Sequence, residues 1–300
     1  MANTIKPWIA AARLRTLPLA LSGIVLGSLL AKADGNGSWV IFGLCVVTAT
    51  LYQIVSNFAN DLGDGIRGTD SKRDGEVRMV GSGQITPGAM KRAVAVSSAV
   101  ALLCSALLIW LALDRLGGHL LAVFSALAVL SVLAALGYTL GKKPYGYMRL
   151  GEVMVFFFFG WVAVAGTYTI TTGVFNPNIL WPASAVGLLA AGVLNLNNLR
   201  DIHTDVNHGK KTVANALGFR YARVYHYILI ILALDCIFVY NWLSDTNWTR
   251  NLFFLAIPAL LLHMLKVSKL QKPREADPLL KDLALSTLAL SVLLGLGHII

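Results

Sequence analysis

The hydrophobic residues of this chain fall into nine long apolar stretches separated by short polar segments. They cover residues 17–33, 39–59, 89–113, 119–141, 151–174, 179–199, 224–243, 250–267 and 279–299. Each is close to the roughly 20 residues that an α-helix needs to cross the hydrocarbon core of a bilayer. The pattern therefore predicts an all-α polytopic membrane protein with nine transmembrane helices.

Composition supports a membrane protein. The 300 residues are 56% hydrophobic and 13% charged, which leaves too few polar side chains to cover a soluble protein of this size. The first apolar stretch is followed by eight others and lacks a convincing small-residue cleavage site, so it reads as a first transmembrane helix rather than a cleaved signal peptide.

The basic residues predict the orientation. All 25 Lys and Arg residues except Lys32, Arg115 and Arg250 lie at alternate ends of the apolar stretches, on one side of the membrane. Cytoplasmic loops carry such an excess, so we expect a bacterial cytoplasmic (inner) membrane protein with its N-terminus inside and its C-terminus outside. This topology accounts for the net charge of +10, and no nucleic-acid partner is required.

Two polar clusters lie at the cytoplasmic ends of the second and sixth predicted helices. The first contains Asn57, Asn60, Asp61 and Asp64, whose spacing of three or four residues aligns them on a continuing helix. In the second, Asn198, Asp201 and Asp205 have the same spacing, and Asn195 and Asn197 lie one turn earlier. For either cluster alone, a solvated helix cap is the alternative.

Carboxylates at this depth are costly unless they are paired, hydrated or neutralised by a metal. Asp and Asn without Cys or clustered His provide the hard oxygen ligands that Mg²⁺ prefers. Basic residues near the clusters would neutralise diphosphate oxygens: Arg13, Arg67, Lys72, Arg73, Arg78, Lys210 and Lys211. Some of these serve only as topology markers.

The two clusters are four helices apart. This spacing predicts one membrane domain over residues 1–300 with helices 1–4 and 5–8 as a possible internal repeat and the ninth helix appended. Internal repeats are also common in transporters, so the repeat alone does not indicate an enzyme.

Four motifs are distributed along nearly the whole chain: Arg13-Leu-Arg15-Thr-Leu-Pro18, Asn57-x-x-Asn60-Asp61-x-x-Asp64 with Gly68-x-Asp70, Tyr138 and Pro144-Tyr-Gly-Tyr with Leu150-Gly-Glu152, and Asn195 to Asp205 with Gly209-Lys-x-Thr212. Together they resemble the UbiA superfamily of membrane prenyltransferases and, within it, the 1,4-dihydroxy-2-naphthoate polyprenyltransferase (MenA) family. The chain departs from the family at Leu14, where a Pro often follows the arginine of the first helix.

The resemblance implies nine helices around a central cavity that opens sideways to lipid, and it assigns roles to individual residues. Asp64, Asp201 and Asp205 would bind Mg²⁺ with help from Asn60 and Asn198, and Asp61 and Asp70 would contribute. Arg13, Arg78 and Lys211 would bind the diphosphate. Candidates for the aromatic acceptor are Tyr138, Lys142, Tyr145, Arg149 and Glu152.

The implied reaction transfers a polyprenyl chain from polyprenyl diphosphate to 1,4-dihydroxy-2-naphthoate with loss of CO₂, which yields demethylmenaquinol and diphosphate. Phe156 to Phe159, together with Trp161, would either shield the allylic cation or pack against lipid or other helices. Two alternatives remain. Another aromatic acceptor such as 4-hydroxybenzoate is disfavoured by the Gly68-x-Asp70 spacing. An ion-coupled transporter would place polar residues deep within several helices, not at one face.

Overall fold

The computed structural model describes residues 5–67, 78–207, 209–244 and 248–300. Within them the predicted all-α fold is confirmed, since helices account for all the regular structure apart from one isolated bridge between Met148 and Lys211. The helices are α1 (Ile5–Ala12), α2 (Leu17–Ala33), α3 (Trp39–Arg67), α4 (Pro87–Leu111), α5 (Gly118–Gly137), α6 (Gly151–Val155), a π-helix (Phe156–Gly166), α7 (Thr167–Thr172), α8 (Leu180–Arg200), α9 (Ile202–Asn207), α10 (Val213–Leu243), α11 (Ile257–Ser268) and α12 (Asp277–Ile299). Short 3₁₀ turns cover Leu14–Thr16, Tyr145–Tyr147, Pro177–Ile179, Trp248–Ala256 and Pro273–Ala276.

In this part of the chain nine helical segments are long and apolar enough to cross a membrane, as predicted. The first, second, seventh and ninth of them extend six residues or more beyond the apolar stretches that predicted them. The second continues through the polar cluster to Arg67, and the seventh begins at Val213, with a non-helical Gly218 near its start. Apolar content alone does not mark these ends, because buried polar side chains that find partners can continue a helix.

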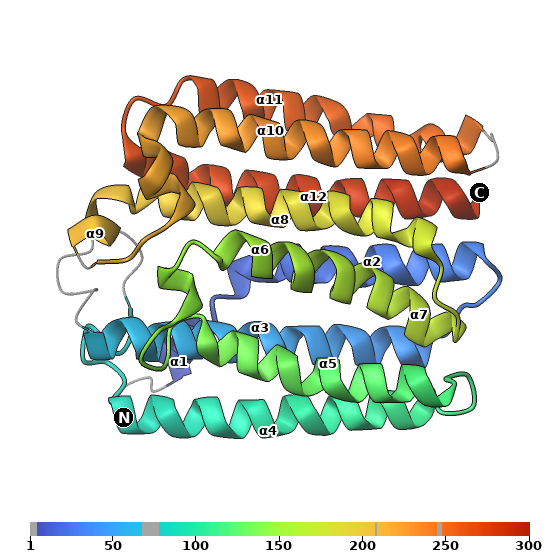
Figure 1. Cartoon of the computed structure of the whole chain (residues 1–300), viewed down its shortest axis with the longest axis horizontal. Helices are drawn as coiled ribbons and strands as arrows, with labels where there is room; N and C mark the ends of the chain where they lie inside the picture. Colours follow the sequence, from blue (N-terminus) through green and yellow to red (C-terminus); the bar gives the residue numbers. More distant parts are fainter. Residues whose placement is uncertain (1–4, 68–77, 208, 245–247) are drawn as a thin grey trace.

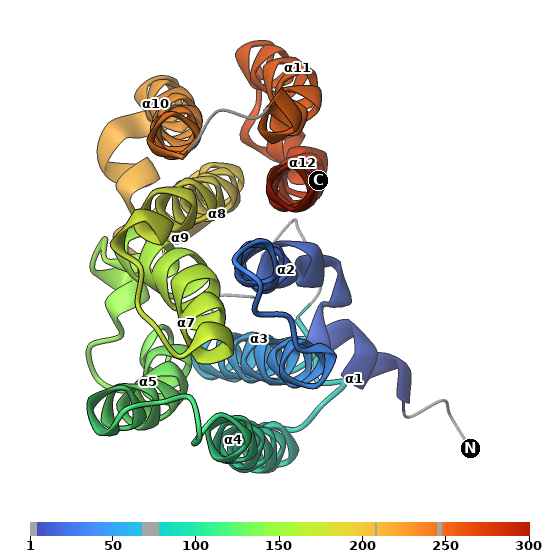
Figure 2. The same ribbon diagram turned by 90° about the vertical axis from the view of Figure 1, so that its right-hand side faces the viewer.

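The membrane helices run side by side along the long axis of the molecule (Figure 1). Viewed from one end, they surround the interior, with α2, α3, α5, α7 and α8 drawn around its centre (Figure 2). In the apolar part of the membrane segment Pro177–Arg200, which contains α8, 67% of the residues are buried, whereas in that of α5 the share is 17%. α8 is therefore a central packing element, and α5 lies nearer the periphery of the bundle.

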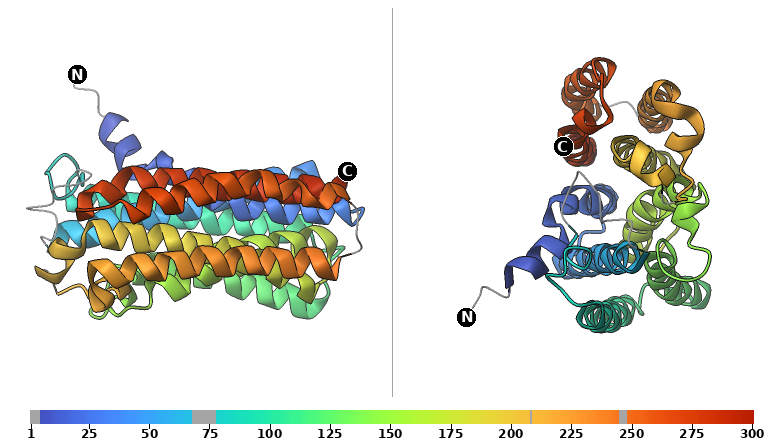
Figure 3. Two further views of the ribbon diagram at one scale, coloured as in Figure 1. Left: turned by 90° about the horizontal axis from the view of Figure 1, so that it is seen from above. Right: turned by 90° about the vertical axis from the view of Figure 1, so that its left-hand side faces the viewer.

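The N-terminal segment breaks before the first membrane helix. α1 projects away from the bundle, as both end views show (Figures 2 and 3). Arg13 joins it to the following turn in a left-handed conformation with φ 51° and ψ 57°. The amide of Asn57 donates hydrogen bonds across this break, to the Ala12 carbonyl at 2.8 Å and to Thr16 Oγ1 at 3.3 Å. The bonds hold the break against α3.

The membrane segment after α6 is π-helical from Phe156 to Gly166, a wider helix that is usually found in short pieces near functional sites. Glycines in the adjacent helices make room for it. A Cβ added at Gly27 of α2 would lie 2.4 Å from the Val164 carbonyl oxygen, and one at Gly187 of α8 would lie 2.6 Å from that of Phe156. Backbones therefore meet directly on two sides of the π-helix.

Replacing Gly187 with Leu is expected to lower the melting temperature in detergent by about 5 °C or more, because overpacking would force α8 away from the π-helix. Gly43→Leu is the matched control, since nothing lies within 4 Å of a Cβ added at Gly43. Equal melting temperatures for the two variants, measured by differential scanning fluorimetry, would show that this contact is not tight.

Candidate active site

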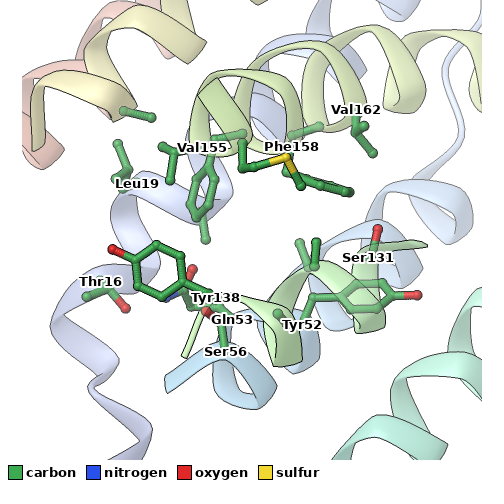
Figure 4. A pocket seen from close by; sticks show the side chains of 18 of the residues that line it. Thr16, Leu19, Tyr52, Gln53, Ser56, Ser131, Tyr138, Val155, Phe158 and Val162 are labelled. Atoms are coloured by element: carbon green, nitrogen blue, oxygen red, sulfur yellow. The ribbon is translucent and has the colours of Figure 1, made fainter. Parts of the chain in front are cut away.

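A cavity of about 370 Å³ opens within the bundle. Along α3 its wall runs from Asp64 to Cys45, a length of roughly 28 Å at the helical rise of 1.5 Å per residue. Arg13, Asn60, Asp64, Arg78 and Lys210 line one end, and Leu108, Ile109, Phe124 and Ile170 line the wall toward the other. In Figure 4, Thr16, Gln53, Ser56 and Tyr138 gather on one side, and Val155, Phe158 and Val162 face them. A polar mouth thus leads into an apolar channel.

Asp64 is the central carboxylate of the first cluster. It is 6% exposed, and its Oδ2 accepts a hydrogen bond from Arg78 Nη2 at 2.9 Å. The Tyr147 hydroxyl donates to its Oδ1 at 3.1 Å. Burial and the Asp64 charge raise the pKa of Tyr147 to about 12, which keeps this phenol protonated as a donor. Asn60, one helical turn earlier, accepts from Thr139 Oγ1 at 3.2 Å and also lines the cavity.

The structure gives Asp61 a different environment from that expected of a metal ligand. Its Oδ1 and Oδ2 accept hydrogen bonds from the backbone amides of Val80 and Met79, at 2.8 and 3.0 Å. The cavity wall includes Asn60 and Asp64 but not Asp61, and Asp201 and Asp205 of the second cluster are also absent from it. Asp70, the other expected contributor, lies outside the described residues.

The second cluster does not form one continuous helical stripe. α8 ends at Arg200, Asp201 takes a non-helical conformation, and the short α9 begins at Ile202. At this point Arg200 Nε and Nη2 donate to both oxygens of Asp201 at 2.9 and 2.8 Å, and its Nη1 donates to Asp277 at 2.6 Å. Bidentate pairing of this kind fixes a carboxylate firmly.

Asp205 pairs with Lys210, whose Nζ lies 3.2 Å from Asp205 Oδ2. A left-handed Gly209, with φ 68°, turns the chain so that the Lys210 amide also donates to the Asp205 carbonyl. Lys210 lines the cavity, whereas Lys211 is exposed and is absent from its wall. Of the two adjacent lysines, Lys210 therefore contributes to the cavity mouth, whereas Lys211, the predicted diphosphate ligand, does not.

The loop between α5 and α6 connects the two clusters. The backbone amide of Arg149 donates to the Lys211 carbonyl at 3.0 Å, and that of Lys211 donates to the Tyr147 carbonyl at 3.3 Å. This pairing places the Tyr147 ring 6.0 Å from Lys210 Nζ while its hydroxyl contacts Asp64. The clusters thus lie at the same end of the bundle, as the sequence predicted, and Tyr147 links them.

The five acceptor candidates separate into three environments. Tyr138 and Tyr145 line the cavity with their rings edge to face at 5.4 Å. Lys142 and Arg149 are exposed and do not contribute to the cavity wall. Glu152 is buried, and its Oε1 accepts from Asn198 Nδ2 at 3.0 Å, so its contact is with the second cluster.

Residues that the sequence interpretation did not single out also belong to the site. Gln53 and Ser56 line the cavity, and Arg200 and Tyr147 hold the two acidic clusters. Gln53 and Ser56 lie four residues before Asn57 and Asn60, so the periodicity of the first motif, extended back one turn, would have found them. Of the aromatic run, Phe158 and Phe159 line the cavity, and Trp161 is 38% exposed.

The donor atoms present suit Mg²⁺ delivered with a diphosphate. Within the described ranges, no group of three His, Cys, Asp or Glu side chains could hold a metal by itself. Asp64 and Asp205 instead present hard oxygens from the two clusters, each next to a cation. Asn198 Oδ1 is buried and finds no hydrogen-bond partner in the described part of the chain. Since Mg²⁺ uses few protein carboxylates and completes its shell with phosphate and water, this set fits.

Comparison with known proteins identifies relatives over almost the whole chain. Residues 20–288 match the model of the UbiA prenyltransferase family. The chain is 40% identical to a 1,4-dihydroxy-2-naphthoate octaprenyltransferase of Haemophilus influenzae, over 99% of this chain and 96% of that protein. It is 39% identical to the Escherichia coli protein of the same description, over 97% and 94% of the two chains.

Solved structures share the fold at lower identity. A UbiA homolog from Aeropyrum pernix K1 superposes with a TM-score of 0.71 at 18% identity and covers 95% of this chain and 97% of its own. A UbiA homolog from Archaeoglobus fulgidus bound to GPP and Mg²⁺ superposes with a TM-score of 0.68 at 17% identity, over 96% and 99% of the two chains.

Proposed function

Because the chain belongs to the UbiA prenyltransferase family, we propose that it transfers a polyprenyl chain from polyprenyl diphosphate to 1,4-dihydroxy-2-naphthoate, with loss of CO₂, to give demethylmenaquinol and diphosphate. The observation that carries this proposal is the cavity, in which a charged mouth opens into an apolar channel of roughly 28 Å. A polyprenyl diphosphate has the same division between a charged head and an apolar tail.

Arg13, Arg78 and Lys210 are the residues that would bind the diphosphate, since all three line the mouth. Arg78 and Lys210 pair with Asp64 and Asp205 in the structure described here. Cations already directed at the mouth stabilise negative charge without reorganising, and they would favour the departure of diphosphate.

Asp64, Asp201 and Asp205, with Asn60 and Asn198, are the residues that would hold Mg²⁺. The Archaeoglobus fulgidus homolog is described as bound to GPP and Mg²⁺, which supports Mg²⁺ as the metal. The bound ion would neutralise charge on the diphosphate and so assist cleavage of the allylic carbon–oxygen bond.

The channel walls would position the two carbon partners. As the allylic C–O bond breaks, its electron pair leaves with diphosphate, and the ring carbon that bears the carboxylate forms the new C–C bond. The carboxylate then leaves as CO₂ and returns its electron pair to the ring. Phe158 and Phe159 would shield the allylic cation from water. Gln53, Ser56 and Tyr138, grouped beside the mouth, would donate hydrogen bonds to the acceptor.

The distribution of basic residues supports a location in the bacterial cytoplasmic membrane with the cavity mouth facing the cytoplasm. Arg13, Arg78 and Lys210 at the mouth belong to the cation-rich side, whereas Lys32 and Arg115 belong to the other. The N-terminus would then lie inside and the C-terminus outside.

Purified protein in detergent, given polyprenyl diphosphate, Mg²⁺ and carboxyl-labelled 1,4-dihydroxy-2-naphthoate, is expected to release labelled CO₂ in step with diphosphate. 4-Hydroxybenzoate in place of the naphthoate is expected to give no prenylated product, and a chelator is expected to stop the reaction. The labelled CO₂ would be trapped and counted, and the prenylated product would be measured by chromatography.

Each contrary result has a separate meaning. Prenylation of 4-hydroxybenzoate alone would assign a different acceptor, and activity that survives chelation would remove Mg²⁺ from the proposal. Ion flux in liposomes without prenylation of either acceptor would support a transporter instead.

A further inference from the structure

The polar side chains of α3 form two adjacent stripes. Asn60 and Asp64 form one, and Asn57 and Asp61 form the other, offset by roughly 60° around the helix axis at 3.6 residues per turn. Asn57, Asn60 and Asp64 contribute to the cavity wall, whereas Asp61 does not. The side chains of Asn57 and Asp61 make hydrogen bonds to the backbone of other segments.

Asp61 attaches the segment that begins at Arg78. Its side chain is buried, and a buried carboxylate is costly unless hydrogen bonds satisfy it. The amides of Met79 and Val80 supply them. Gly65, one turn further along α3, permits the contact, because a Cβ there would lie 2.6 Å from Val80 Cγ1. Asp61 and Gly65 thus hold this segment directly against α3.

The attached segment carries a cation of the cavity mouth. Arg78 immediately precedes the two amides that Asp61 binds, and its guanidinium reaches Asp64 on the neighbouring stripe. The bonds from Asp61 therefore fix the backbone from which Arg78 extends. Met79 and Val80 are also buried, in a cluster with Phe58 and Leu62 of α3, so the segment has a fixed position.

Asn57 makes the equivalent contact with the segment that carries Arg13. Its side-chain amide binds the carbonyl before Arg13 and the Thr16 hydroxyl after it. Arg13 lines the cavity from a left-handed conformation, which is unfavourable for a residue other than glycine. The two hydrogen bonds hold the backbone in that conformation.

We propose that Asp61 and Asn57 are positioning residues that attach the Arg78 and Arg13 segments to α3, and that Asp61 acts in this way and not as a ligand of Mg²⁺. This inference rests on the proposed function only in one respect, namely that the two arginines bind the diphosphate of the substrate. The attachment itself is a property of the protein without substrate.

Hydrogen exchange measured by mass spectrometry on the substrate-free protein tests the attachment directly. In Asp61→Asn one acceptor oxygen becomes an NH₂ group facing a backbone N–H, so exchange at Met79 and Val80 is expected to accelerate about tenfold or more. Asp64→Asn is the matched control and is expected to leave both amides unchanged. Asn57→Ala is expected to accelerate exchange at Thr16, whose amide donates to the Arg13 carbonyl at 2.9 Å.

Kinetics separate positioning from metal binding. Asp61→Asn is expected to raise the KM for polyprenyl diphosphate about tenfold while the Mg²⁺ concentration for half-maximal activity changes by less than about twofold. Combined with Arg78→Ala, its effect on KM is expected to be less than additive, because both variants remove the same cation from the mouth.

Unchanged exchange at Met79 and Val80 in Asp61→Asn, together with a raised Mg²⁺ requirement, would overturn the proposal and make Asp61 a ligand. If Asp61→Asn does not fold, Gly65→Ala provides the test, since it displaces Val80 without altering a carboxylate. It should produce the same exchange and KM changes. Faster exchange without prenyl transfer by the wild-type protein would retain the attachment and reject the proposed function.

Discussion

Turnover by Asp64→Ala and by Asp201→Ala is expected to fall about 10³-fold or more, with both proteins still folded in detergent. Asp64 lies in the cavity wall between Arg78 and Tyr147 and presents a hard oxygen to the mouth. Asp201 belongs to the second cluster, where the adjacent Arg200 holds both of its carboxylate oxygens. Loss of either carboxylate would weaken the Mg²⁺ site that both clusters are proposed to share. Initial rates at saturating substrate and Mg²⁺ would measure the loss.

Two controls distinguish this effect from unfolding. Asp64→Ala leaves a buried arginine without this carboxylate, which is destabilising, so Asp64→Asn serves as the isosteric variant and is expected to show the same loss. Asp282→Ala removes a half-exposed carboxylate that pairs with Lys266 away from the cavity wall, and normal turnover is expected. Near-normal turnover in Asp64→Asn or Asp201→Ala would remove that carboxylate from the site.

The sequence was informative wherever local composition determined structure. The apolar stretches predicted all nine membrane segments found in the described residues, and the three- and four-residue spacing correctly placed Asn57 to Asp64 on a continuing helix. The sequence also predicted that the two acidic clusters lie at the same end of the helix bundle, because the positions of the basic residues indicate which helix ends share one side of the membrane.

What the sequence did not reveal depends on contacts between distant segments. Arg200, at the end of α8, pairs with Asp201 and with Asp277, which is 77 residues away in the chain. The partners of Asp61 lie beyond a loop, so its motif position alone did not distinguish it from Asp64. Which of Lys210 and Lys211 reaches the cavity depends on the turn at the left-handed Gly209, because successive residues after such a turn point in different directions.

Lys210→Ala is expected to lower kcat/KM for polyprenyl diphosphate about 10- to 100-fold, because it removes a charge-assisted contact from the cavity mouth. Lys210 is buried, is held through Asp205 and extends from a backbone whose carbonyl accepts from Asn215 at 2.8 Å. The cation is therefore positioned before the diphosphate enters, and its loss should affect transfer more than it affects folding.

Lys211→Ala is the matched control, because the adjacent lysine has the same charge but an exposed side chain. Its structural contribution is made by the backbone, which pairs with Tyr147 and Arg149 and which alanine preserves. We expect kcat/KM within about twofold of wild type, since an exposed charge outside the cavity wall is largely screened by solvent and salt. A larger loss in Lys211→Ala than in Lys210→Ala, measured in the same assay, would return the diphosphate-binding role to Lys211 and require the Gly209 turn to rearrange when substrate binds.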